Sequence, residues 1–204
     1  MAKLYETIDE RLQAFIAEQP VFFVATAPDS GGHVNVSPKG YKDTFSVIDE
    51  KTVAYLDLYG SGSETIAHLR DDGRITVMFC SFGRRPKILR LHGTGRVVRP
   101  DAAEWDELAG RFGAGHAGYR AIVVIDVARV SDSCGYSIPY MELTGERSLL
   151  DDQHARRSPE EWVPRVQRNA SSIDGLPALE PDHPAPAGAP VPAPASGVSG
   201  PAGA

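Results

Sequence analysis

Apolar residues over the first two thirds of the chain fall mainly into runs with the period of β-strands. Residues 21–27 are almost continuously apolar, and residues 33–38 alternate apolar and polar side chains, which is typical of a strand with one buried face. Turn-forming residues separate these runs, and the pattern predicts six or seven strands. The other strand-like runs cover residues 44–48, 52–58, 74–82, 88–99 and 121–127.

Short helices are predicted where capping residues precede apolar positions at helical spacing. Thr7 and Glu10 have the spacing of a capping box, and the helix that follows is expected to end before the first proline. Ser61 and Glu64 have the same spacing and predict a helix over residues 64–70. A third helix is expected from a cap at Asp101 to about residue 112.

The order of these elements predicts a mainly β, α+β protein built on an antiparallel barrel with a few short peripheral helices. Strands that follow one another as hairpins favour antiparallel pairing, whereas a doubly wound parallel sheet needs a helix between successive strands. Gly93 and Gly95 lie inside one strand-like run, and glycines there indicate a bend or bulge of the kind found at barrel corners.

Composition divides the chain into three parts. Residues 1–135 hold the strand-like runs and form the expected barrel domain, while residues 136–177 form a less regular extension that is expected to pack on the barrel or on a dimer partner. Trp162 and Ile173 are the expected packing anchors of that extension. Residues 178–204 contain seven of the sixteen prolines and no aromatic residue, which predicts a disordered tail.

Overall composition limits the class of protein. The 204 residues are 42% hydrophobic and 24% charged, enough for one core, and no apolar run nears the roughly 20 residues that span a bilayer. The first residues do not resemble a signal peptide, so a cytoplasmic protein without a membrane partner is expected. Cys80 and Cys134 lie far apart, with no histidine or cysteine at metal-ligand spacing, which favours two buried thiols over a disulfide or a metal site.

The net charge of −6 argues against a general nucleic-acid-binding surface. One local exception is a basic cluster that begins with Arg84, Arg85 and Lys87 and continues through Arg90. This cluster has two interpretations, a solvated hairpin tip with one strand face or a pocket for an anionic ligand.

The stretch Gly60-Ser-Gly-Ser-Glu-Thr65 has the composition of an anion-binding turn. It follows a strand-like run and precedes a helix, so glycines let backbone amides approach a ligand and the first helical turn leaves N–H groups unpaired. It lacks the Gly-Lys-Ser/Thr ending of a P-loop and the third glycine of a dinucleotide-binding fingerprint. Taken alone, the stretch is equally well explained as a simple helix cap.

Lys39 adds a cation to this picture. Taken alone, a lysine at the end of a strand is best explained as a solvated residue. A meander that brought Lys39 close to the turn would give a phosphomonoester a cation, hydroxyl groups and a helix N-terminus in one place.

Together these motifs resemble those of the pyridoxamine 5′-phosphate oxidase-like family. The resemblance rests on the order of His33-Val-Asn-Val-Ser-Pro-Lys-Gly40, Thr52-Val-Ala-Tyr-Leu-Asp-Leu58, the turn over residues 60–65, and Ile88-Leu-Arg-Leu-His-Gly-Thr-Gly-Arg-Val-Val98. It covers roughly residues 8–135. The resemblance implies a split β-barrel that forms a homodimer and binds FMN at the dimer interface.

The resemblance also implies where FMN would be bound. The first of these strands would lie along the isoalloxazine ring, the second would contact the flavin through its backbone, the turn would face the phosphate, and Arg90 would face the flavin. By position, the implied cofactor-binding residues are Asn35, Val36, Ser37, Pro38, Lys39, Gly40, Tyr55, Leu56, Ser61, Ser63, Glu64, Thr65 and Arg90. The sequence names no catalytic residue.

Two departures from the family pattern narrow the expected activity. Many members carry a basic pair where this chain has Glu64 and Thr65, so the phosphate charge would have to be met by Lys39, Arg90 or an arginine of the basic cluster. The family's oxidases also end in an Arg- and His-bearing segment, which residues 131–139 and the Pro/Ala-rich tail replace. The resemblance therefore favours an uncharacterised subgroup over a true pyridoxamine phosphate oxidase.

The leading hypothesis is an FMN-binding flavoprotein, an oxidoreductase of a small organic substrate in which the flavin carries the hydride chemistry. The alternatives on the same fold are a non-catalytic flavin- or haem-binding sensor and a deazaflavin-dependent reductase. Residues 133–139 are interpreted either as a cover over the flavin pocket or as a surface loop packed on the barrel through Tyr136 and Pro139.

Overall fold

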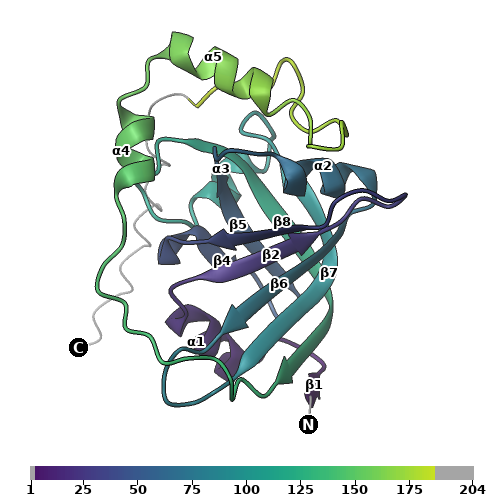
Figure 1. Cartoon of the computed structure of the whole chain (residues 1–204), viewed down its shortest axis with the longest axis vertical. Helices are drawn as coiled ribbons and strands as arrows, with labels where there is room; N and C mark the ends of the chain where they lie inside the picture. The colour runs from purple at the N-terminus through teal and green to yellow at the C-terminus, as the bar shows by residue number, and fades with distance from the viewer. Residues whose placement is uncertain (1–2, 187–204) are drawn as a thin grey trace, which may run out of the picture.

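The computed structural model describes residues 3–186, and their strands form one antiparallel sheet that curls into a split barrel (Figure 1). The predicted mainly β, α+β class and the antiparallel split barrel are confirmed. The strands of the described residues are β1 (Lys3–Tyr5), β2 (Phe22–Thr26), β3 (Asn35–Lys39), β4 (Phe45–Val47), β5 (Thr52–Leu58), β6 (Arg74–Cys80), β7 (Ile88–Val98) and β8 (Tyr119–Ser133). The sequence pattern did not predict β1.

The strand order is β3-β2-β6-β7-β8-β5-β4, with β1 paired to β8. Val24, Val77, Leu91 and Val130 stand opposite one another on four neighbouring strands, and all four are buried. Their chain neighbours point outward, because successive side chains in a strand face opposite sides of the sheet. Each buried aliphatic side chain of this kind contributes about 1.5–3 kcal/mol to stability.

Gly93 produces the bend that the sequence predicted in β7. The register between β7 and β8 shifts between His92 and Gly93. A Cβ atom on Gly93 would lie only 2.1 Å from the carbonyl oxygen of Asp126, so a larger residue would force the two strands apart. The bulge and the glycine together let the sheet turn its corner.

The helices of the described residues are short and lie outside the barrel wall. They are α1 (Glu10–Glu18), the 3₁₀ helix η1 (Lys42–Thr44), α2 (Glu64–Asp71), α3 (Trp105–Ala109), α4 (Leu149–Ala155) and α5 (Pro159–Arg168). Asp9, rather than Thr7, caps α1, and its carboxylate accepts from the Leu12 N–H at 2.9 Å. The helix expected after Asp101 is much shorter than predicted.

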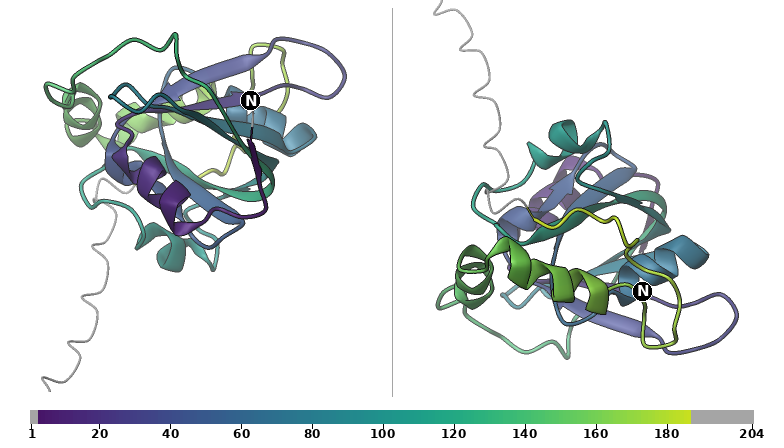
Figure 2. Two further views of the ribbon diagram at one scale, coloured as in Figure 1. Left: turned by 90° about the horizontal axis from the view of Figure 1, so that it is seen from below. Right: turned by 90° about the horizontal axis from the view of Figure 1, so that it is seen from above.

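Helix α1 lies across the lower end of the barrel (Figure 2). Its buried residues Leu12 and Ile16 follow helical spacing and join the core cluster inside the barrel. This end is therefore filled by apolar side chains, and the cavity described below lies elsewhere.

The segment after β8 runs along the outside of the barrel and forms α4 and α5 at its upper end (Figure 1). Ser158 and Glu161 form a complete capping box at the start of α5. Trp162 is 1% exposed and its ring centroid lies 5.2 Å from that of Tyr59, which confirms it as a packing anchor. Ile173 is 72% exposed, so its expected role as a packing anchor is wrong. Tyr136 is 84% exposed, which argues against the interpretation in which this residue packs on the barrel.

The chain after α5 returns across the barrel. The Arg70 guanidinium donates to the Ala178 carbonyl at 2.6 Å, and His183 Nε2 bonds to the Arg120 carbonyl at 2.8 Å. Residues 187–204, which make up most of the predicted tail, lie outside the described residues. Cys80 is buried as predicted, whereas Cys134 is exposed, and both thiols are free.

Across residues 3–186, every helix is too short or too polar to cross a membrane.

Candidate functional site

Asp57 is a fully buried carboxylate that lies between two cations near the end of β5. Its Oδ1 is 2.9 Å from Lys39 Nζ on β3, and its Oδ2 accepts from Arg120 Nε on β8 at 2.6 Å. Strands β3 and β5 are not neighbours in the sheet, so the Lys39–Asp57 ion pair spans the open side of the split barrel. Arg120 also donates to the Gly62 carbonyl at 2.8 Å and to Asn169 Oδ1 at 2.7 Å.

The Asp57 carboxylate at the centre of this triad of Lys39, Asp57 and Arg120 is ionised at neutral pH. Burial alone would raise the pKa of Asp57, but the charges of Arg120 and Lys39 outweigh it and lower this pKa to about 2. Two cations and one carboxylate leave one positive charge over. Lys39 Nζ lies 5.7 Å from the ring centroid of Tyr55, in a cation–π arrangement.

A network of amide and hydroxyl groups lies beside the triad, along the edge strand β3. Asn35 Nδ2 donates to Thr26 Oγ1 at 3.1 Å and to Thr65 Oγ1 at 3.0 Å, while Ser37 Oγ donates to Asn35 Oδ1 at 2.9 Å. Asn35 and Ser37 are both half-buried because they share the face of β3 that turns toward α2. The network ties the edge strand to the start of α2.

The extension binds the turn over residues 60–65. Ser63 Oγ donates to the Ser171 carbonyl at 3.2 Å, and the Glu64 carboxylate accepts from the Ile173 N–H at 3.1 Å. The capping box expected between Ser61 and Glu64 does not form, because Ser63 is the N-cap of α2 and Glu64 faces the extension. Ser61 remains exposed at the tip of the turn.

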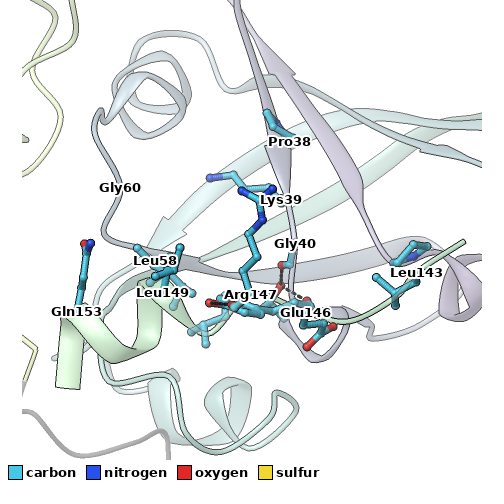
Figure 3. Close-up of a pocket in the computed structure, with 15 residues that line it drawn as sticks. Pro38, Lys39, Gly40, Leu58, Gly60, Leu143, Glu146, Arg147, Leu149 and Gln153 are labelled. Atoms are coloured by element: carbon cyan, nitrogen blue, oxygen red, sulfur yellow. Dashed lines mark hydrogen bonds between the residues drawn. The ribbon is translucent and has the colours of Figure 1, made fainter. Parts of the chain in front are cut away.

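A cavity of about 580 Å³ opens between the barrel and the extension, next to the triad (Figure 3). This volume lies in the range of cofactor and small-molecule sites. The barrel wall consists of Pro20, Pro38, Lys39, Gly40, Tyr41, Thr44, Leu56, Leu58 and Gly60. The extension wall consists of Leu143, Glu146, Arg147, Leu149, Leu150 and Gln153.

His116 connects the two walls behind the cavity. Its Nδ1 lies 3.1 Å from Asp151 on α4, and its Nε2 lies 3.1 Å from Asp43 on η1. Burial alone would lower the pKa of His116, but the carboxylates of Asp151 and Asp43 outweigh it and raise this pKa. The Tyr41 ring packs against the imidazole with a centroid distance of 4.9 Å, so His116 is held on three sides.

The structure brings one group of the sequence-implied residues together and separates another. The residues that line the cavity are Pro38, Lys39, Gly40 and Leu56. Those in the adjoining network are Asn35, Ser37 and Thr65.

Three other implied residues, Val36, Tyr55 and Arg90, do not line the cavity. Val36 points outward and is 62% exposed, whereas Tyr55 is fully buried in the barrel core. Burial, followed by the charge of Asp57, raises the pKa of the Tyr55 phenol well above its usual range. Arg90 lies on β7 and donates to Ser133 Oγ at 3.0 Å.

Sequence reasoning missed Asp57, Arg120 and Arg147. The first two carried a signal, because Asp57 interrupts an apolar strand and Arg120 directly precedes another, and a charge buried in such a run needs a partner. No sequence signal marked Arg147, because the segment around it follows neither a helical nor a strand period.

The sequence of this chain matches a known protein family and a relative within it. Residues 8–134 match the family model described as Pyridoxamine 5′-phosphate oxidase. The chain is 38% identical over 195 residues to the pyridoxamine 5′-phosphate oxidase family protein ustO of Aspergillus flavus, a match that covers 88% of this chain and 78% of the relative.

Two solved structures are among those that this chain matches. HupZ of Group A Streptococcus is 27% identical with a TM-score of 0.46, and the match covers 60% of this chain and 91% of that one. A FAD-binding protein of Mesorhizobium loti is 17% identical with a TM-score of 0.46, and the match covers 65% of this chain and 96% of that one.

Proposed function

Because the chain belongs to the pyridoxamine 5′-phosphate oxidase family, we propose that it is a flavoprotein that binds FMN in the cavity beside Lys39. The proposed activity is the oxidation or reduction of a small organic substrate. The flavin, when bound, supplies the hydride chemistry, and the protein supplies binding, orientation and electrostatics.

One observation carries this proposal, namely a largely apolar cavity with cations on both of its walls. FMN consists of a planar ring system, which needs apolar surface, and a phosphate, which needs positive charge and N–H donors. Leu56, Leu58 and Leu149 supply apolar surface, and Lys39 and Arg147 supply positive charge. The carboxylate of Glu146 also lines the cavity, and it accepts from the Lys42 N–H at 3.4 Å. The residues present therefore fit the chemistry of the cofactor.

The residues around the cavity have separable roles under this proposal. Asp57 holds the Lys39 ammonium group in place, so this charge does not have to be ordered when a ligand binds. Asn35 fixes the edge of β3 against α2 through its two donated hydrogen bonds. Leu143 and Leu149 of the extension line the cavity, so a bound ring system would cover their apolar side chains.

We also propose a homodimer that covers the outer face of β2, β3 and β6. Val34 and Val36 are 70% and 62% exposed, and Val36 stands beside Ala25 on that face. Contiguous apolar surface on a sheet face is typical of an association site. Pro38 also stands on this outer face, opposite Phe23 in β2, and lines the cavity, so the cofactor site would border the interface.

Light scattering tests the dimer. We expect a mass of two chains for the wild type and a shift toward one chain for Val36→Glu. The matched control is Thr94→Glu, an exposed strand residue away from the patch, which should leave the mass unchanged. A wild-type mass of one chain at tens of micromolar would contradict the dimer.

The deciding experiment for the cofactor is to denature freshly purified protein and identify what is released. We expect flavin absorbance bands, the mass of FMN, and reduction of the bound flavin by a nicotinamide cofactor. A colourless protein that does not bind added FMN would contradict the proposal, and so would release of a deazaflavin or haem in its place. Flavin that no electron donor reduces would contradict the oxidoreductase activity alone.

A variant links the flavin to this cavity. Lys39→Ala should weaken FMN binding about tenfold, because a charge-assisted contact of this kind contributes about 1.5–3 kcal/mol. Lys51→Ala removes the charge of an exposed lysine in the turn before β5 and should leave the affinity unchanged. Equal affinities for both variants would place the flavin elsewhere.

A further inference from the structure

Arg147 carries a positive charge from the extension into the cavity. Figure 3 shows its side chain rising from the extension in the direction of Lys39 on the barrel wall. Within residues 3–186 its guanidinium group has no carboxylate or carbonyl partner, although its backbone carbonyl is engaged. A guanidinium group has five N–H donors in a planar fork that matches a phosphate or carboxylate.

A hydrogen bond to its backbone holds Arg147 at the cavity. The Tyr41 hydroxyl donates to the Arg147 carbonyl at 2.8 Å, and Tyr41 has a φ of 59°, a value that costs energy in residues other than glycine. Leu143 and Leu149 flank this point and line the cavity, yet they are 61% and 64% exposed. Apolar side chains exposed toward a cavity favour a ligand that covers them.

The barrel wall alone does not match the charge of a phosphomonoester. Such a group carries about −1.5 to −2 at neutral pH. Lys39 shares Asp57 with Arg120, so the triad offers one net positive charge. The turn over residues 60–65 adds the negative charge of Glu64, whose carboxylate is bound to the backbone of the extension.

We propose that Arg147 binds the phosphate of the flavin, so that the extension supplies the cation that the turn lacks. This inference rests on the proposed flavin binding. It makes the segment over residues 143–150 both the cover of the cavity and the part that distinguishes a phosphorylated flavin from an unphosphorylated one. The apolar side chains of the same segment would contact the ring system of either.

The test compares FMN with riboflavin, which lacks only the phosphate. Apoprotein is titrated with each flavin, and binding is followed by quenching of flavin fluorescence. Arg147→Gln should raise the Kd for FMN by about 10- to 100-fold, the loss expected for charge-assisted hydrogen bonds to one phosphate, and change the Kd for riboflavin less than about twofold. Arg147→Lys should recover part of the loss.

The matched control is Arg156→Gln, which removes an exposed arginine of the same extension that does not line the cavity. Its affinities for both flavins should equal those of the wild type. An equal loss of FMN and riboflavin in Arg147→Gln would overturn the inference, because Arg147 would then shape the cavity without binding phosphate. An unchanged FMN affinity would overturn it as well. If the wild type binds neither flavin, the proposed function itself fails.

Discussion

The two walls of the cavity are built by different physical means. The barrel wall consists of hydrogen-bonded strands braced by a buried charge triad, whereas the extension segment over residues 143–150 is held by the Tyr41 hydroxyl on the Arg147 carbonyl and by the Lys42 N–H on the Glu146 carboxylate. A region with dense buried contacts opens only when the whole protein unfolds, whereas a region with sparse ones opens locally. We therefore expect the segment over residues 143–150 to open more readily than the strands of the barrel wall.

The largest expected effect comes from removing the centre of the triad. Asp57→Ala leaves Lys39 and Arg120 without their shared carboxylate, and breaking a buried ion pair in this way costs about 3–5 kcal/mol. We expect global unfolding at lower urea concentration, with all spectroscopic probes changing together. Asp126→Ala removes an exposed carboxylate from β8 and should change the free energy of unfolding by less than about 0.5 kcal/mol. An Asp57→Ala variant with the same free energy of unfolding as the wild type would mean that the triad does not stabilise the barrel wall.

A smaller and local effect is expected for the extension. Trp162→Ala empties a buried site between α5 and Tyr59 and should cost about 3 kcal/mol of docking energy. Hydrogen exchange should show lost protection in α4 and α5 and unchanged protection in β2 and β6. Val163→Ala, at a 52% exposed position of the same helix, serves as the control. Equal loss of protection in the central strands would mean that the extension and the barrel unfold as one unit.

The smallest effect is a pH dependence of extension docking. The pKa of His116 is raised in the folded state, so the stabilisation from its charged form is complete below the ordinary value of about 6.5 and is lost as pH rises through the folded value. We expect protection of α4 to fall by about 1 kcal/mol above that range, an effect the size of one charge-assisted hydrogen bond. His116→Gln should remove this dependence. A wild type with the same protection at pH 6 and pH 9 would contradict it.

The sequence predicted the barrel well, because its strands alternate or run apolar and its turns contain glycine and proline. It also raised a meander that brings Lys39 close to the turn over residues 60–65, and in the structure Lys39 and Gly60 line the same cavity. The register shift at Gly93 followed from the glycine itself.

The parts that could not be predicted depend on contacts between segments far apart in the chain. Glu64 has the sequence position of a capping residue, but Ile173 competes for its carboxylate from 109 residues away. Arg147 lies in a segment without periodicity, and its position depends on the hydroxyl of Tyr41. Ile173 was predicted as buried because it is apolar, yet the backbone of its segment, rather than its side chain, makes the contact.

One feature of β3 limits how copies of this protein can associate. The strand forms one edge of the sheet, and Pro38 stands within it. Proline has no N–H to donate, and its ring obstructs an incoming strand, so this edge is a poor template for adding a strand from another molecule. Pro38 thus lines the cavity and also disfavours the addition of a strand from another molecule at this open sheet edge.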